Sequence, residues 1–121
     1  MKKTQFIARL ALLVTVALIL WLALSPSPPS TAWSDKVNHI IAFFVLAGLL
    51  DYATVETASF NRKAVSLLSL GFSIEALQFL TGYRYFEVGD LIADCVGMLI
   101  YLAMRRHIRP TIDRLCLTYI G

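Results

Sequence analysis

The sequence has little charge and only two cysteines. Of its 121 residues, 16% are Asp, Glu, Lys or Arg and 58% are hydrophobic. A chain this apolar is not an ordinary soluble domain. It contains neither a Gly-rich phosphate-binding loop nor a His-Glu-x-x-His zinc motif, so it lacks those nucleotide-binding and metalloprotease signatures. Cys95 and Cys116 form no Cys-x-x-Cys pair and are expected at different depths, so we expect no disulfide between them.

Long apolar blocks take up most of the chain. Their lengths approach the roughly 20 residues that cross a bilayer, and they lack the polar faces that a soluble four-helix bundle shows at helical spacing. The sequence therefore predicts an all-α fold, a small polytopic membrane protein with a single domain, 1–121. The four predicted transmembrane helices are at about 7–24, 36–53, 64–80 and 88–104.

The basic residues predict the orientation of these helices. Nine of the eleven Lys and Arg lie before or at the start of the first block, between the second and third, or after the fourth; only Lys36 and Arg84 fall on the other side. By the positive-inside rule, both termini and the middle loop are cytoplasmic. The net charge of +3 then reflects these flanks, and we expect no nucleic-acid partner.

The segments outside the blocks have simpler interpretations. Residues 1–24 also resemble a secretory signal, but the apolar run is long for one, so we expect it to be retained. The proline-rich stretch 25–30 is predicted to be the first outer loop. Residues 51–63 are expected to form a polar cytoplasmic loop without a motif. In the tail, 105–121, apolar residues at helical spacing predict an amphipathic helix on the inner leaflet, with a solvated basic tail as the alternative.

Polar side chains interrupt the outer halves of three blocks. Asp35 and His39 are four residues apart and share a face of the second predicted helix. In the fourth, Asp90 and Asp94 begin a stripe that continues through Gly97 and Tyr101. Ionisable groups in hydrocarbon cost roughly 2.5–3.5 kcal/mol each on insertion scales, so we expect them to face one another. The predicted site residues are Asp35, His39, Glu75, Gln78, Arg84, Asp90 and Asp94.

Acidic residues outnumber basic ones in this predicted cluster. Close carboxylates in low dielectric do not all ionise together, so we expect a shared proton or a bound cation. The alternative is a hydrogen-bonded plug that only fixes the helix register. The inner halves of the blocks carry almost no ionisable side chains. The small residues Ser66, Ser69, Gly71 and Ser73 are expected to let the third helix pack closely and to bond across to its neighbours.

Two motifs connect these residues to a known family. The first is Asp35-Lys36-x-x-His39 followed by Phe43-Phe44-x-Leu46-x-Gly48, and the second is Ile74-Glu75-x-x-Gln78-Phe79 followed by Arg84 and Asp90-x-x-x-Asp94-x-x-Gly97. Their order and spacing resemble the VanZ-like membrane proteins. The family often has Asn where Asp94 stands, and a Pro-Gly-Arg turn where this chain has Gly82-Tyr83-Arg84. The resemblance implies a multi-pass protein of the bacterial cytoplasmic (inner) membrane.

The expected function is head-group binding by a non-enzymatic envelope protein. The ligand would be a lipid-linked wall precursor or a lipophilic glycopeptide, because the family is named for a protein associated with low-level resistance to teicoplanin. Arg84 would contact phosphate or carboxylate. Glu75 and Asp90 would accept hydrogen bonds from amines or hydroxyls, and the aromatic residues of 83–86, with both tryptophans, would hold the lipophilic part.

Two other functions use the same residues. One is a membrane enzyme acting on a lipid-linked phosphate or sugar, with His39 as general base and Glu75, Asp90 or Asp94 as acid or metal ligand. The other is a proton-coupled carrier in which Glu75 and Asp94 relay the proton. The apolar inner half of the predicted bundle offers no further groups to carry the proton across the membrane. The sequence alone predicts membrane lipids as partners, and neither a metal nor a cofactor. The alternative is a divalent metal held by His39 and carboxylates, since mixed nitrogen and oxygen ligands suit several metals.

Overall fold

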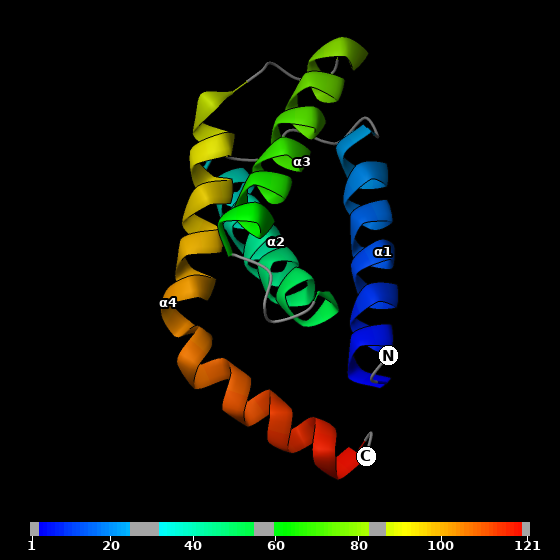
Figure 1. Ribbon diagram of the computed structural model, residues 1–121. Coiled ribbons are helices and arrows are strands. Elements are labelled where there is room, and N and C mark those ends of the chain that lie inside the picture. Colours follow the sequence, from blue (N-terminus) through cyan, green and yellow to red (C-terminus); the bar gives the residue numbers. More distant parts are fainter. Residues whose placement is uncertain (1–2, 25–31, 55–59, 83–86, 120–121) are drawn as a thin grey trace.

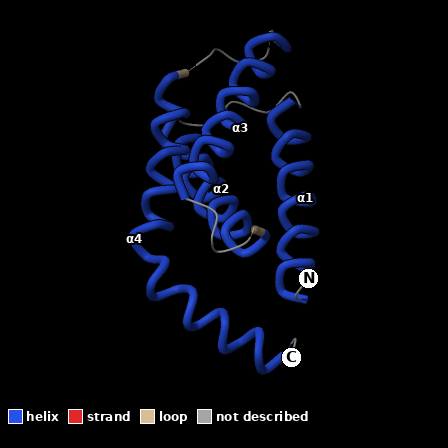
Figure 2. Tube along the Cα trace, viewed as in Figure 1, coloured by secondary structure: helices blue, strands red, loops and turns tan. Residues whose placement is uncertain are grey.

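The computed structural model describes residues 3–24, 32–54, 60–82 and 87–119, and these residues are almost entirely helical. No strand occurs in the described segments (Figure 2). The predicted all-α fold is therefore confirmed. The helices are α1 (Lys3–Leu24), α2 (Ala32–Ala53), α3 (Phe60–Thr81) and α4 (Val88–Tyr119). A helix satisfies its own backbone N–H and C=O groups, as an apolar segment in a membrane requires.

Three helices are long and apolar enough to cross a membrane: Lys3–Leu24, Asp35–Ala53 and Phe60–Thr81. Their large side chains face outward; for example, Val65 is 63% and Leu80 is 77% exposed. Outward apolar faces of this extent suit lipid rather than water. The apolar part of α4 differs, because it contains Asp90 and Asp94 and runs directly into two arginines. The fourth span therefore stays a prediction.

The helices run alternately in opposite directions, and the two termini lie at the same end of the bundle (Figure 1). The helix α4 continues through Pro110 to Tyr119, and its C-terminal part turns beneath the bundle toward the start of α1. Pro110 cannot donate a hydrogen bond to the carbonyl of Arg106, and its ring crowds that carbonyl. This favours a bend in that part of α4.

The centre of the bundle is an apolar core between α2, α3 and α4. It consists of Phe43, Leu46, Ala47, Leu67, Met98 and Tyr101. The backbones of α2 and α4 meet here, since a Cβ atom on Gly97 would lie 2.3 Å from the carbonyl oxygen of Ile40. Only glycine allows this approach, so Gly97 determines how closely the polar side chains of the two helices come together.

Two expectations for the end of the bundle that carries the termini are wrong. The helix α2 ends at Ala53, as predicted, but α3 already begins at Phe60. Asp51 and Lys63, expected in a polar loop, are therefore helical, and both are buried. The serine hydroxyls of Ser66 and Ser73 do not bond across helices. They face outward and bond to carbonyls of their own helix, Arg62 at 3.0 Å and Ser69 at 2.8 Å, because only the opposite face of α3 packs against the bundle.

Candidate functional site

Six of the seven predicted site residues lie on the ends of three helices. Asp35 and His39 lie in the first turns of α2, Glu75 and Gln78 in the last turns of α3, and Asp90 and Asp94 in the first turns of α4. These helix ends meet at the end of the bundle opposite the termini (Figure 1). Arg84, the seventh, lies outside the described residues, as do Tyr83, Tyr85 and Phe86.

His39 is the centre of this group, which we call the His39 cluster: Asp35, Lys36, His39, Glu75, Glu87, Asp90 and Asp94. The ring atom Nδ1 of His39 lies 2.7 Å from Oδ1 of Asp94. The other ring nitrogen, Nε2, lies 3.6 Å from Oδ2 of Asp90 and 3.9 Å from Oε1 of Glu75. If Asp94 is ionised, Nδ1–H donates to it and Nε2 keeps a free lone pair directed at the other carboxylates.

Lys36 closes the cluster on its exposed side. Its Nζ donates to Oε2 of Glu87 at 2.6 Å and also to Oδ1 of Asp90. The side chains of Lys36 and Glu87 are 27% and 50% exposed, whereas that of Asp90 is 1% exposed. The ammonium group therefore lies between the surface and a buried carboxylate, one oxygen of which remains turned toward His39.

Small residues make room for these contacts. A Cβ atom on Gly71 would lie 2.6 Å from Oδ2 of Asp94, so only a glycine on α3 leaves space for that carboxylate. A Cβ atom on Gly89 would lie 3.1 Å from Cε of Lys36, a flexible side chain that can move. The site therefore requires glycine at position 71 and not at position 89.

Unused acceptors remain in the buried part of the site. Among the described residues, Oε1 of Glu75, Oε1 of Gln78 and Oδ2 of Asp94 have no hydrogen-bond partner. The other oxygen of Glu75 accepts from the backbone N–H of Glu87 at 3.4 Å. The amide of Gln78 donates to the carbonyl of Ala23 at 3.1 Å, which connects α1 to this end of the bundle. Buried acceptors without donors are costly, and a ligand that supplies donors or positive charge would relieve this.

A second polar cluster, which the sequence analysis missed, lies at the other end of the core. The buried carboxylate of Asp51 accepts from Lys63 Nζ at 2.8 Å and from Tyr101 Oη at 2.7 Å. It also accepts from Arg105 Nε at 2.7 Å and from Arg109 Nη1 at 3.2 Å. The hydrogen bond to Asp51 raises the pKa of Arg105 above its usual value, so this guanidinium stays charged. We call these five residues the Asp51 cluster.

The Asp51 cluster carries three cations around one carboxylate. Arg109 also lies over the ring of Tyr52, with 4.7 Å from its Cζ to the ring centre. The signal in the sequence was the stripe on α4, because continuing it from Tyr101 by steps of four reaches Arg105 and Arg109. Arginines that follow an apolar block are equally typical of a cytoplasmic flank, which is the prediction made above. Their shared carboxylate joins the C-terminal end of α2, the N-terminal end of α3 and the middle of α4.

An apolar cavity of about 300 Å³ lies apart from the His39 cluster, between α1, α2 and the bent part of α4. Its lining includes Ala8, Gly48, Tyr101 and Ile112. A lining of this kind suits a hydrocarbon chain rather than a polar group.

The comparison with protein families agrees with the two motifs. A family model described as VanZ/LLP1 matches residues 2–109, which include both polar clusters. Searches of curated proteins and of solved structures found no match. The apolar helices and the family match indicate a multi-pass membrane protein, and the chain belongs to the VanZ/LLP1 family.

Proposed function

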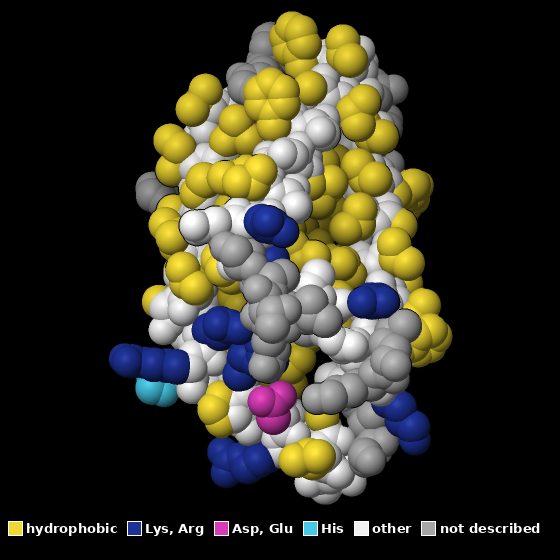
Figure 3. Space-filling view, in the orientation of Figure 1, with side chains coloured by type: hydrophobic (Ala, Val, Ile, Leu, Met, Phe, Trp, Pro, Cys, Tyr) yellow, Lys and Arg dark blue, Asp and Glu magenta, His cyan; other side chains and the backbone are white. Residues whose placement is uncertain are grey.

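We propose that this protein crosses the bacterial cytoplasmic membrane four times, with both termini in the cytoplasm. The two aspartates in the apolar part of α4 are buried against the other helices, so they need not meet lipid. Lys and Arg gather on the end of the molecule that carries the termini, as Figure 3 shows for one face. This distribution fits the positive-inside rule and directs the His39 cluster outward.

We further propose that the His39 cluster binds the head group of a lipid-linked wall precursor or of a lipophilic glycopeptide, without converting it. The observation that supports this most is the set of buried acceptors without donors, Glu75 Oε1 and Gln78 Oε1 among them. A matching ligand has to supply N–H or O–H groups. Sugars and peptide amines have many such donors, and hydrogen bonds to an ionised carboxylate are the stronger kind.

The surface beside the cluster suits an amphiphilic ligand. The ion pair of Lys36 and Glu87 forms the exposed side of the cluster. Phe79 and Leu80 near the end of α3, and Val88 at the start of α4, expose large apolar side chains. A head group could therefore occupy the polar region while its lipid chain lies against α3 and α4. Membrane lipids are the expected neighbours along the remaining apolar faces.

Replacing Glu75 by Gln tests this function. Glu75→Gln keeps the shape of the side chain but removes its charge, so we expect affinity for a lipid-linked disaccharide-peptide or for teicoplanin to fall about tenfold or more. Binding would be measured by native mass spectrometry on protein in nanodiscs, with Asp113→Asn at the exposed inner end as the control. Unchanged binding by folded Glu75→Gln would refute head-group recognition by the cluster.

One observation favours a second candidate, a membrane enzyme acting on a lipid-linked phosphate or sugar. The contact with Asp94 fixes the ring of His39 and leaves Nε2 directed at Asp90, an arrangement that suits a general base beside an acid. Turnover of such a lipid by purified protein, lost in His39→Ala, would establish this candidate. A proton-coupled carrier fits less well, because the apolar core lies between the two polar clusters.

A further inference from the structure

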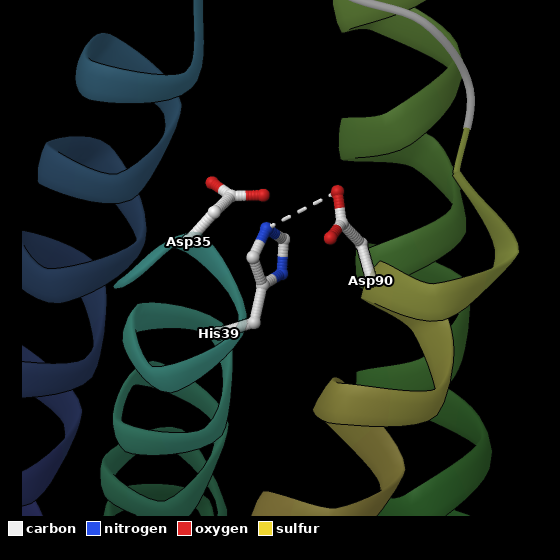
Figure 4. Close-up of side chains that lie close together, drawn as sticks. All are labelled: Asp35, His39 and Asp90. Atoms are coloured by element: carbon white, nitrogen blue, oxygen red, sulfur yellow. Dashed lines mark ion pairs between the residues drawn. The ribbon is translucent and has the colours of Figure 1, made fainter. Parts of the chain in front are cut away.

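Three side chains of the His39 cluster have the geometry of a metal site. Asp35 and His39 of α2 and Asp90 of α4 each offer one ligand atom, and these atoms all lie within 4.8 Å of one another. Figure 4 shows the two carboxylates directed at the imidazole ring, one from each helix. We propose that Asp35, His39 and Asp90 bind a divalent transition-metal ion, with Glu75 as the fourth ligand.

Glu75 provides an observation independent of that group. Its side chain is 1% exposed, and Oε1 has no hydrogen-bond partner among the described residues. The same atom lies 3.9 Å from Nε2 of His39, on a third helix, and so points into the group from α3. A buried carboxylate oxygen without a donor is costly unless a cation is bound beside it.

The orientation of His39 is that of a metal ligand. Histidines that bind metals usually donate the other ring N–H to a carboxylate, which fixes the ring and directs the free lone pair at the metal. Here Nδ1 lies 2.7 Å from Asp94 Oδ1, and Nε2 faces the carboxylates of Asp90 and Glu75. Asp94 is thus a positioning residue for His39.

The separations of the ligand atoms and the charge of the site also fit. Metal–ligand bonds of about 2.0–2.2 Å place neighbouring ligand atoms roughly 3–4 Å apart, and Nε2 of His39 lies 3.6 Å from Asp90 and 3.9 Å from Glu75. Lys36 binds the other oxygen of Asp90, Oδ1, so it does not occupy the ligand atom. One imidazole and three carboxylates suit Zn²⁺, Mn²⁺ or Fe²⁺.

A bound cation would explain how an acidic site accepts a phosphate-linked head group. Lys36 is already paired with Glu87 and Asp90, so it offers little to a phosphate. A divalent ion would supply the contact for phosphate oxygens, while Gln78 accepts from donors of the sugar or peptide. This last step rests on the proposed function, whereas the metal site itself does not.

The test is metal binding by purified full-length protein in detergent, stripped with EDTA and titrated with Co²⁺ and Zn²⁺. We expect one Co²⁺ per chain with visible absorption, displaced by Zn²⁺. His39→Ala and Glu75→Gln should each weaken Co²⁺ binding by more than tenfold, and Asp94→Asn by about tenfold or more. The control is His107→Ala, because His107 is the other histidine of the chain and is exposed on α4; its binding should be unchanged.

Variants near the core could fail to fold, so Asp35→Asn is included. Asp35 lies in the first turn of α2 and is only half-buried, and its replacement should also weaken Co²⁺ binding about tenfold. If the native protein binds Co²⁺ no more tightly than the folded Asp35→Asn and His39→Ala variants do, the proposed metal site is refuted. Measuring head-group binding with and without EDTA separates the two proposals, because the metal can bind without a head group and the head group without a metal.

Discussion

Asp51 accepts hydrogen bonds from three charged side chains and a phenol, all of which reach it from α3 or α4. It is buried, and so is Lys63, its partner on α3. Removing one member of a buried ion pair leaves the other charge uncompensated, which costs more than the pair itself contributes. The stability of the inner end of the bundle should therefore depend strongly on this single carboxylate.

Asp51→Asn tests that dependence. We expect the free energy of unfolding to fall by about 3 kcal/mol, mainly because the ammonium of Lys63 loses its buried partner. Unfolding by denaturant in detergent micelles, followed by helical circular dichroism, would measure this. The exposed Arg106→Gln should change stability by less than about 0.5 kcal/mol; equal effects of the two substitutions would show that the Asp51 cluster is not a stabilising contact.

The contacts of single residues were predictable only in part. Residue spacing predicts that Asp35 and His39 share one helix face and that Asp90 and Asp94 share another. The free-energy cost of a charge in an apolar block indicates that both pairs face the other helices. Residue spacing does not predict which carboxylate contacts which ring nitrogen of His39, because these contacts depend on how the helices pack. Asp51 was missed because a charge at the end of an apolar block equally suits a loop.

At the scale of helices, the contact between α2 and α4 determines the spacing of both clusters. Gly97 lies against the backbone of Ile40, so a Cβ atom there, 2.3 Å from a carbonyl oxygen, forces the helices apart. Gly89, on the same helix, would meet only the flexible end of Lys36. The same substitution at the two glycines therefore compares a Cβ atom that meets backbone with one that meets a flexible side chain.

Gly97→Ala should destabilise the protein, whereas Gly89→Ala should not. Overpacking against backbone costs about 1–3 kcal/mol, so we expect Gly97→Ala to lower the free energy of unfolding despite its better helix propensity. Gly89→Ala should leave it unchanged or raise it by up to about 1 kcal/mol. The same unfolding measurement compares them, and a Gly97→Ala variant as stable as native protein would contradict the close contact between α2 and α4.

The helices themselves were the most predictable elements. Four apolar blocks gave four helices, because a long apolar run in a membrane has to satisfy its backbone internally. The helix ends were less predictable, since α2 and α3 extend past their apolar blocks into polar residues. The tail also differs from a separate surface helix, because α4 continues without a break through Pro110. Its half-buried residues Ile108, Ile112 and Cys116 line the cavity beside α1.

At the scale of the whole molecule, two polar clusters lie at opposite ends of one apolar core. The Asp51 cluster has excess positive charge, whereas the His39 cluster has excess negative charge and buried acceptors without donors. This asymmetry fits a membrane protein that recognises a ligand from one side. It also explains why most basic residues lie on one side of the predicted membrane.

The proposed topology has the His39 cluster facing outward and the Asp51 cluster facing the cytoplasm. Cysteine labelling can test this orientation, with Cys95→Ser and Cys116→Ser as the background and single replacements at two exposed positions, Glu87→Cys and Arg106→Cys. Applied to intact spheroplasts, a membrane-impermeant maleimide should label Glu87→Cys at once and Arg106→Cys only after permeabilisation. Labelling of Arg106→Cys from outside, with Glu87→Cys protected until permeabilisation, would show that the protein has the opposite orientation.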